Sequence, residues 1–135
     1  MAPDNYANNG DVGISIPQLS TSISILTGEV DVSVTVKNEY RLPLKTVRIF
    51  LIAYDHDGKV IPGTTGVLEV PGPILRNQAL GPFKIASVMQ DRDVRCVQVS
   101  RVEAIRLDYV TLYATGADAN NLVRGESRRA CAAAG

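Results

Sequence analysis

The side chains best suited to chemistry in this sequence lie in one short stretch, Asp55-His56-Asp57-Gly58. Two carboxylates beside the only histidine could hold a metal ion or exchange protons with a substrate. Adjacent residues in a tight turn point in different directions, however, and no third ligand lies near them in the sequence. An Asp-Gly pair ahead of a Lys-Val-Ile run is typical of a β-hairpin turn, because Gly accepts the positive φ that such turns need. The stretch therefore predicts a turn, and an enzyme that uses His56 remains as an alternative.

Other patterns of catalytic or ligand-binding residues are missing from the sequence. There is no Gly-x-Ser-x-Gly motif and no Gly-rich phosphate loop between a strand and a helix. Asp91, Asp93, Glu103 and Asp108 are scattered along alternating segments, a pattern more typical of a solvated face than of a carboxylate pair. We therefore expect no catalytic residue, no cofactor and no metal site, and the prediction is that the protein is not an enzyme.

Two cysteines, Cys96 and Cys131, could form one disulfide that ties the C-terminal segment to the rest of the domain. The alternative is a pair of unpaired thiols, one in a strand and one on a loose tail. Two cysteines and one histidine without paired spacing do not make a zinc ligand set. We predict the disulfide.

Composition excludes several classes of partner. Lys plus Arg and Asp plus Glu number 14 each, so the net charge of zero gives no reason to expect nucleic acid. Aromatic residues make up only 5% of the chain, too few for a base-stacking surface. No run approaches the roughly 18 apolar residues that span a bilayer.

The N-terminal stretch MAPDNYANNGDVG lacks the basic start and apolar core of a signal peptide. Two interpretations stay open: a cytoplasmic protein, or a mature periplasmic or secreted chain whose signal peptide has been removed. The polar, Asn-rich start and the even cysteine count favour the second.

The elements that would position these residues are β-strands, arranged around residues 29–61. Val30, Val32, Val34 and Val36 alternate strictly with polar residues, which predicts a strand packed on one face. The strand at residues 45–54 is apolar on both faces, so we expect it to be central and covered on both sides, with Arg48 reaching toward one end.

The remaining segments predict further short strands. One is expected at residues 12–16, before Pro17, and the Ser and Thr content of residues 18–27 predicts an edge strand with one solvated face. Breaks at residues 62–66 and 71–73 would bracket a short strand at 67–70. Within residues 101–115 the alternation of apolar and polar residues changes phase midway, as at a β-bulge or a bend between sheets. We divide the chain into a flexible lead-in (1–11), a domain (12–115) and a tail without a core-facing pattern (116–135). The tail carries three arginines, at 124, 128 and 129, which form either a docking peptide or a solvated segment. Seven to eight short strands favour an all-β, antiparallel sandwich, with a small barrel as the alternative.

Several motifs resemble those of the FxLYD-type bacterial domains, which are similar to the late-embryogenesis-abundant-like sandwiches. The matching segments are residues 32–38, Pro43-Leu44-Lys45, 47–55, Asp57-Gly58-Lys59-Val60 and 80–85. The phenylalanine of the family pattern is only approximated here, by Phe50 or Ile52. The resemblance implies an immunoglobulin/fibronectin-like sandwich in an exported or envelope-associated bacterial protein, and it implies no particular chemistry.

These observations predict a non-enzymatic domain that binds another protein or supports a bacterial envelope or secreted assembly. The expected contact surfaces are sheet edges, which could also join copies of the chain, and two loops. One loop is Asp55–Gly58, and the other is Pro62–Gly66 with Thr64 and Thr65. If the edge at residues 20–27 binds the partner, proline at Ser24 should abolish binding and spare the fold. The alternative is a small-molecule or lipid-binding sandwich with a cavity lined by the strand at residues 47–54.

Overall fold

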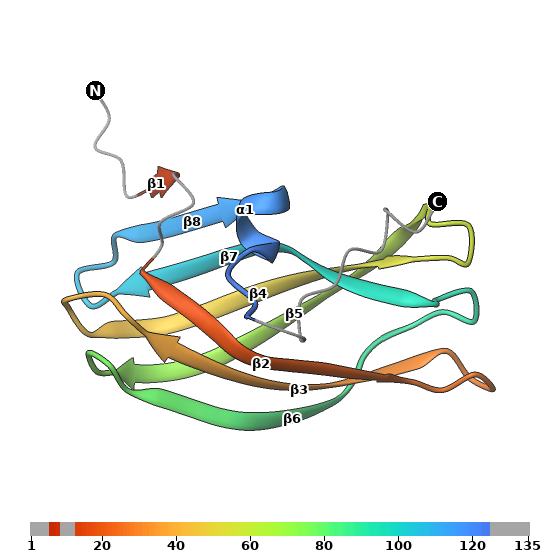
Figure 1. Cartoon of the computed structure of the whole chain (residues 1–135), viewed down its shortest axis with the longest axis horizontal. Helices are drawn as coiled ribbons and strands as arrows, with labels where there is room; N and C mark the ends of the chain where they lie inside the picture. The colour runs from red at the N-terminus through yellow and green to blue at the C-terminus, as the bar shows by residue number, and fades with distance from the viewer. Residues whose placement is uncertain (1–5, 9–12, 125–135) are drawn as a thin grey trace.

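Two β-sheets packed face to face make up the computed structural model, which describes residues 6–8 and 13–124 (Figure 1). One sheet has five strands in the order β1-β8-β7-β4-β5, and the other has three in the order β2-β3-β6. Neighbouring strands are antiparallel, except that β1 and β8 are parallel. The predicted all-β sandwich of seven to eight strands is confirmed. The strands are β1 (Tyr6–Asn8), β2 (Ile14–Ile23), β3 (Glu29–Asn38), β4 (Leu44–Tyr54), β5 (Val60–Ile74), β6 (Ala79–Gln90), β7 (Cys96–Arg106) and β8 (Thr111–Thr115).

The hydrophobic core lies between the sheets, and β3 and β4 each contribute a row of buried side chains to it. The four alternating valines of β3 are all buried, as their spacing predicts. The residues of β4 that face the same core are fully buried too: Val47, Ile49, Leu51 and Ala53. Burial of one Val, Ile or Leu side chain contributes roughly 1.5–3 kcal/mol. A register slip of one residue in either strand would therefore expose its entire apolar row.

The strand β4 is central in its sheet, between β7 and β5, but only one of its faces is covered. On the outer face Phe50, Ile52 and Tyr54 are half-buried. The prediction of cover on both sides was wrong, because the three-stranded sheet packs against one face only. Arg48 also differs from the prediction. It lies in mid-strand, with its Nε 3.2 Å from Glu69 of β5.

One long strand, β5, replaces the predicted short strand at residues 67–70. The Pro- and Gly-containing segments at 62–66 and 71–73 lie within β5 and do not interrupt it. Edge strands tolerate proline, since an amide that faces solvent donates no ladder hydrogen bond. Because β5 is at the edge of its sheet, the strand continues through these prolines and glycines.

The phase change predicted within residues 101–115 is a turn between two strands. β7 ends at Arg106, and a tight turn closed by a hydrogen bond from the Tyr109 amide to the Arg106 carbonyl (2.9 Å) leads into β8. Tyr109 has a positive φ of 68°. The interpretation as a bulge or bend at this point was wrong, because a hairpin also reverses the alternation of inward and outward residues.

Residues from the predicted tail and lead-in join the sandwich. After β8 comes a short helix, α1 (Gly116–Asn120), and Ala119, Leu122 and Val123 are buried in the core. The expectation that this segment lacks core-facing residues was wrong. Its apolar positions are too few and too widely spaced to give a periodic signal. Likewise, residues 6–8 of the lead-in form β1.

Candidate functional site

One edge of the three-stranded sheet is formed by β2, and the other is formed by β6. The sequence predicted two segments here, with the second an edge strand at residues 18–27. In the structure β2 is one strand that ends at Ile23, and a register shift between residues 15 and 18 accommodates Pro17. The edge position is confirmed. Near its start, Ile16 forms a parallel bridge with Val123, so a segment of this chain already pairs with this edge.

The hydrogen bonds of the β2–β3 hairpin fix which backbone groups of β2 face outward. The Ser24 amide donates to the Glu29 carbonyl at 2.9 Å, which makes this a hydrogen-bonded pair. In an antiparallel ladder such pairs alternate with pairs whose N–H and C=O groups point away from the partner strand. Ser22 therefore faces β3, and the backbone N–H and C=O of Thr21 and Ile23 face away from it. Among the described residues, none pairs with these groups.

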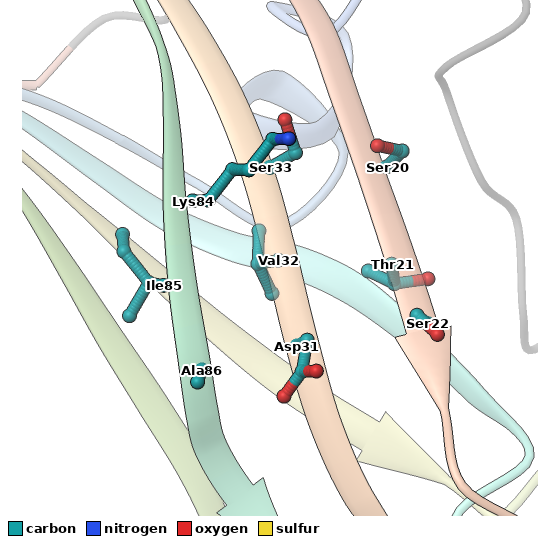
Figure 2. A pocket seen from close by; sticks show the side chains of 9 residues that line it. All are labelled: Ser20, Thr21, Ser22, Asp31, Val32, Ser33, Lys84, Ile85 and Ala86. Carbon is teal, nitrogen blue, oxygen red and sulfur yellow. The ribbon is translucent and has the colours of Figure 1, made fainter.

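A shallow pocket of about 280 Å³ lies on the sheet face next to this edge (Figure 2). The strands place Ser20 of β2, Ser33 of β3 and Lys84 of β6 in one row. The next row begins with Ser22 and Asp31. The depression exists because the serine side chains in these rows are small. Figure 2 shows the Lys84 side chain running from β6 toward Ser33.

Hydrogen bonds hold several polar groups of this face in place. The Gln18 amide nitrogen donates to the hydroxyls of Ser20 (2.9 Å) and Ser33 (3.3 Å). The Asp31 carboxylate accepts a hydrogen bond from the Ser87 amide at 2.9 Å. Ser87 has a positive φ of 51° at an irregular point of β6, so its amide turns toward Asp31. The face beside the β2 edge is thus polar and ordered, and it carries both signs of charge.

The predicted Asp55–Gly58 turn forms the β4–β5 hairpin. Asp55 Oδ1 accepts hydrogen bonds from the amides of Asp57 (2.8 Å) and Lys59 (3.0 Å), and Gly58 has φ 77°. The Lys59 amide, followed by the Asp57 amide and the positive charges nearby, lowers the pKa of Asp55 below its ordinary value. The His56 side chain is 77% exposed. The carboxylate of Asp55 therefore holds the turn, and the described residues contain no group of three metal ligands.

The other predicted site residues are spread over the molecule. Thr64 and Thr65 lie within β5 and not in a loop, and Thr65 is exposed. Cys96 is half-buried at the start of β7, next to Tyr54 of β4. Cys131 lies outside the described residues, as do Arg128 and Arg129, so the disulfide stays a prediction and the choice between a docking peptide and a solvated tail stays open.

The pockets of the described part are all at the surface. Of the four that were characterised, none is lined by the buried β4 residues that the small-molecule alternative requires. Within residues 6–8 and 13–124, no helix is long and apolar enough to cross a membrane.

Comparison of the chain with protein-family models, curated proteins and solved structures gave no match. The resemblance to FxLYD-type domains therefore stays a prediction. The sequence pointed to the β2 edge through its Ser and Thr content. It missed the pocket on the sheet face, which combines residues from three strands, and only their register brings those residues together.

Proposed function

We propose that this chain is a non-catalytic binding domain that accepts an extended segment of a partner protein at the edge of β2. The observation that carries the proposal is the outward-facing backbone of Thr21 and Ile23. An unpaired edge offers N–H and C=O groups to an added strand, and nearby pockets select its side chains. The pocket beside Ser20 and Ser22 is well placed for that selection.

The composition of the edge supports the proposal. Between Gln18 and Ile23, β2 has no proline, lysine or other charged residue, although such residues commonly protect edges against pairing. The other sheet has two edge strands: β5 contains three prolines, at 62, 71 and 73, and β1 is only three residues long. β6 has two irregular points in its pairing with β3. In the described residues, the end of β2 is thus the edge best suited to strand addition.

The sharpest test of this edge is Thr21→Pro. Proline removes the outward amide and leaves the ladder to β3 intact, because the Thr21 amide does not donate to β3. The originally predicted probe, proline at Ser24, is unsuitable, since the Ser24 amide closes the hairpin. Thr21→Ala is the matched control, because it removes the side chain and keeps the amide.

The measurement is quantitative affinity capture from the cell-envelope fraction of the source organism, with tagged wild type and both variants. We expect at least one protein to bind wild type and Thr21→Ala and to be lost, by about tenfold or more, from Thr21→Pro. Thermal unfolding checks that both variants are folded. An identical set of bound proteins for all three chains would refute the β2 edge as the binding site.

The cysteine pair and the resemblance to FxLYD-type domains support a place in a bacterial envelope or secreted assembly. A disulfide between Cys96 and Cys131 belongs to this proposal, since such bonds persist in oxidising compartments. The exposed turn position of His56 supports the non-catalytic assignment. Full binding by His56→Ala is the corresponding expectation.

A further inference from the structure

The most exposed large apolar side chains of the described residues lie at the tip of the β2–β3 hairpin. Ile25 is 82% exposed and Leu26 is 83% exposed. The tip is held rigidly. Hydrogen bonds join the Gly28 amide to the Ser24 carbonyl (2.7 Å) and the Asp91 amide to the Gly28 carbonyl (3.0 Å). The two aliphatic side chains therefore project into water from a fixed base. Exposure of apolar surface to water is unfavourable, and burial in an apolar partner site would remove this free-energy cost.

At the opposite end of the molecule an apolar groove of about 770 Å³ lies on the outer face of the five-stranded sheet. Its walls include Pro71 and Pro73 of β5, Leu107 and Tyr109 of the β7–β8 turn, and the charged side chains of Lys45, Arg48 and Glu69. Leu107 and Tyr109 are more than half exposed. Lys45 lies over the Tyr109 ring, with its Nζ 5.3 Å from the ring centre. The groove is within the size range of about 300–1,000 Å³ that is typical of ligand pockets.

Each end of the sandwich holds three of the connections between strands (Figure 1). The tip is on a connection at one end, and the groove is beside a connection at the other. The β2–β3, β4–β5 and β6–β7 connections meet at one end, where Gly28 bonds Asp91 and Tyr54 pairs with Cys96. The β3–β4, β5–β6 and β7–β8 connections meet at the other, where Leu44 pairs with both Ile74 and Arg106.

Within the described residues, the strand connections at the two ends carry opposite net charge. Counted with two strand residues on either side, the three connections at the tip end hold five acidic and three basic residues. The same count at the groove end gives two acidic and five basic residues. The surplus is thus two negative charges at the tip end and three positive charges at the groove end. The basic residues at the groove end are Lys37, Arg41, Lys45, Arg76 and Arg106.

We propose that copies of this chain associate head to tail, with the Ile25–Leu26 tip of one molecule seated in the Leu107–Tyr109 groove of the next. Apolar burial supplies the attraction, and the opposite charges of the two ends favour this orientation over tip to tip or groove to groove. The contact is heterologous, because two different surfaces of the same chain meet. Such contacts extend into open chains when the rotation between neighbours does not close a ring.

A second copy fits this pair of surfaces better than a membrane does. Insertion into an anionic bilayer is favoured by basic residues around an apolar tip. The tip end has an acidic surplus instead, which an anionic surface would repel. The same surplus is attracted to the basic groove end.

The test is analytical ultracentrifugation of two variants, alone and together. Ile25→Ser/Leu26→Ser removes the tip, and Leu107→Glu places a carboxylate in the groove; all three sites are exposed, so both variants should fold. We expect the wild-type mass to rise with concentration beyond that of a dimer, and each variant alone to stay monomeric. An equimolar mixture should form heterodimers and nothing larger, since only one intact tip–groove pair can form.

The mixture separates head-to-tail association from every symmetric arrangement. A monomeric wild type, a monomeric mixture, or unchanged association of either variant would overturn the proposal. Tip-dependent sedimentation with phosphatidylcholine vesicles by a chain that stays monomeric would overturn it in favour of a membrane contact. Raising the salt from about 0.1 M to about 1 M shortens the Debye length from about 10 Å to about 3 Å and should weaken the association. Association that is insensitive to salt would contradict the charge argument.

This inference does not depend on the partner proposed for β2. Thr21→Pro should leave self-association unchanged, and the tip variant should still bind whatever the β2 edge binds. The two proposals can therefore fail separately.

Discussion

At the scale of single residues, the Asn38 side chain joins separate parts of the chain. It is fully buried, at the end of β3. Its amide nitrogen donates to the carbonyls of Leu42 (3.0 Å) and Ile74 (2.9 Å), and its amide oxygen accepts from the Tyr40 amide (2.7 Å). One side chain thus satisfies backbone groups from both the β3–β4 loop and the end of β5. Because unpaired buried groups are costly, this asparagine is hard to replace.

Replacement of Asn38 by alanine should lower the free energy of unfolding by about 2–4 kcal/mol, because three backbone groups would lose their partner in a buried site. Urea denaturation monitored by circular dichroism measures this loss. Asn38→Asp should cost at least as much, since a carboxylate cannot donate to two carbonyl oxygens. Gln78→Ala is the control; its side chain bonds only the neighbouring Leu75 amide, and it should cost less than about 1 kcal/mol. Equal losses for Asn38→Ala and Gln78→Ala would contradict this role.

At the scale of elements, the carboxylate of Asp55 reinforces a β4–β5 turn that backbone hydrogen bonds between Asp55, Gly58 and Lys59 also close. Asp55 accepts two backbone hydrogen bonds across the turn, and they lower its pKa in the folded state. The folded protein therefore releases the Asp55 proton more readily than the unfolded chain does. This contribution to stability is fully present above the unfolded pKa of about 3.9, and it is lost as the pH falls through that value toward the lower folded pKa.

The substitution Asp55→Asn should flatten this part of the acid response. Asparagine keeps an oxygen acceptor for the turn but cannot titrate, so we expect a smaller loss of stability than in wild type on acidification below about pH 4. Thermal unfolding in a series of buffers from neutral to acidic pH measures the difference. Asp55→Ala, which removes the acceptor altogether, should instead be less stable than wild type at neutral pH. Parallel pH profiles for wild type and Asp55→Asn would show that this carboxylate is not coupled to folding.

At the scale of the whole molecule, the sandwich separates its surfaces by location. The outward-facing end of β2, at Thr21 and Ile23, lies along one side, and the apolar tip and the apolar groove lie at opposite ends (Figure 1). Strand addition and end-to-end association can therefore occur on one molecule without competing for the same residues. A domain with these surfaces would suit an extended assembly that also holds a second protein.

The predicted disulfide between Cys96 and Cys131 belongs to this scale, because it would join the start of β7 to the far C-terminal segment. Intact mass after thiol alkylation, with and without prior reduction, tests it on protein from the native host. We expect both thiols to take up label only after reduction. The loop-closure model then gives a stability loss of about 3–4 kcal/mol on reduction. Labelling without reduction would remove the main support for an exported protein and direct the partner search to the cytoplasm.

How well the sequence predicted each part depended on whether the signal was local. The alternating valines of β3 and the Asp-Gly turn are local, since the period of a strand and the positive φ of Gly58 follow from neighbouring residues. β5 shows the opposite case. Its prolines predicted breaks, and only its place at a sheet edge allows the strand to continue through them.

The features of the candidate surfaces also divide into those that local sequence predicts and those that only the tertiary structure shows. The sequence by itself determined an all-β sandwich, an edge strand rich in Ser and Thr and a tight turn at Asp55, because strand periodicity and turn chemistry act over a few residues. The tertiary structure decided that Thr21 and Ile23 face outward, since this depends on the hydrogen-bonding phase of β2 against β3. It also placed Leu107 beside Pro71, far from the Ile25 tip. Those relations are set by strand register and sheet order, which join residues distant in the chain and leave no local pattern.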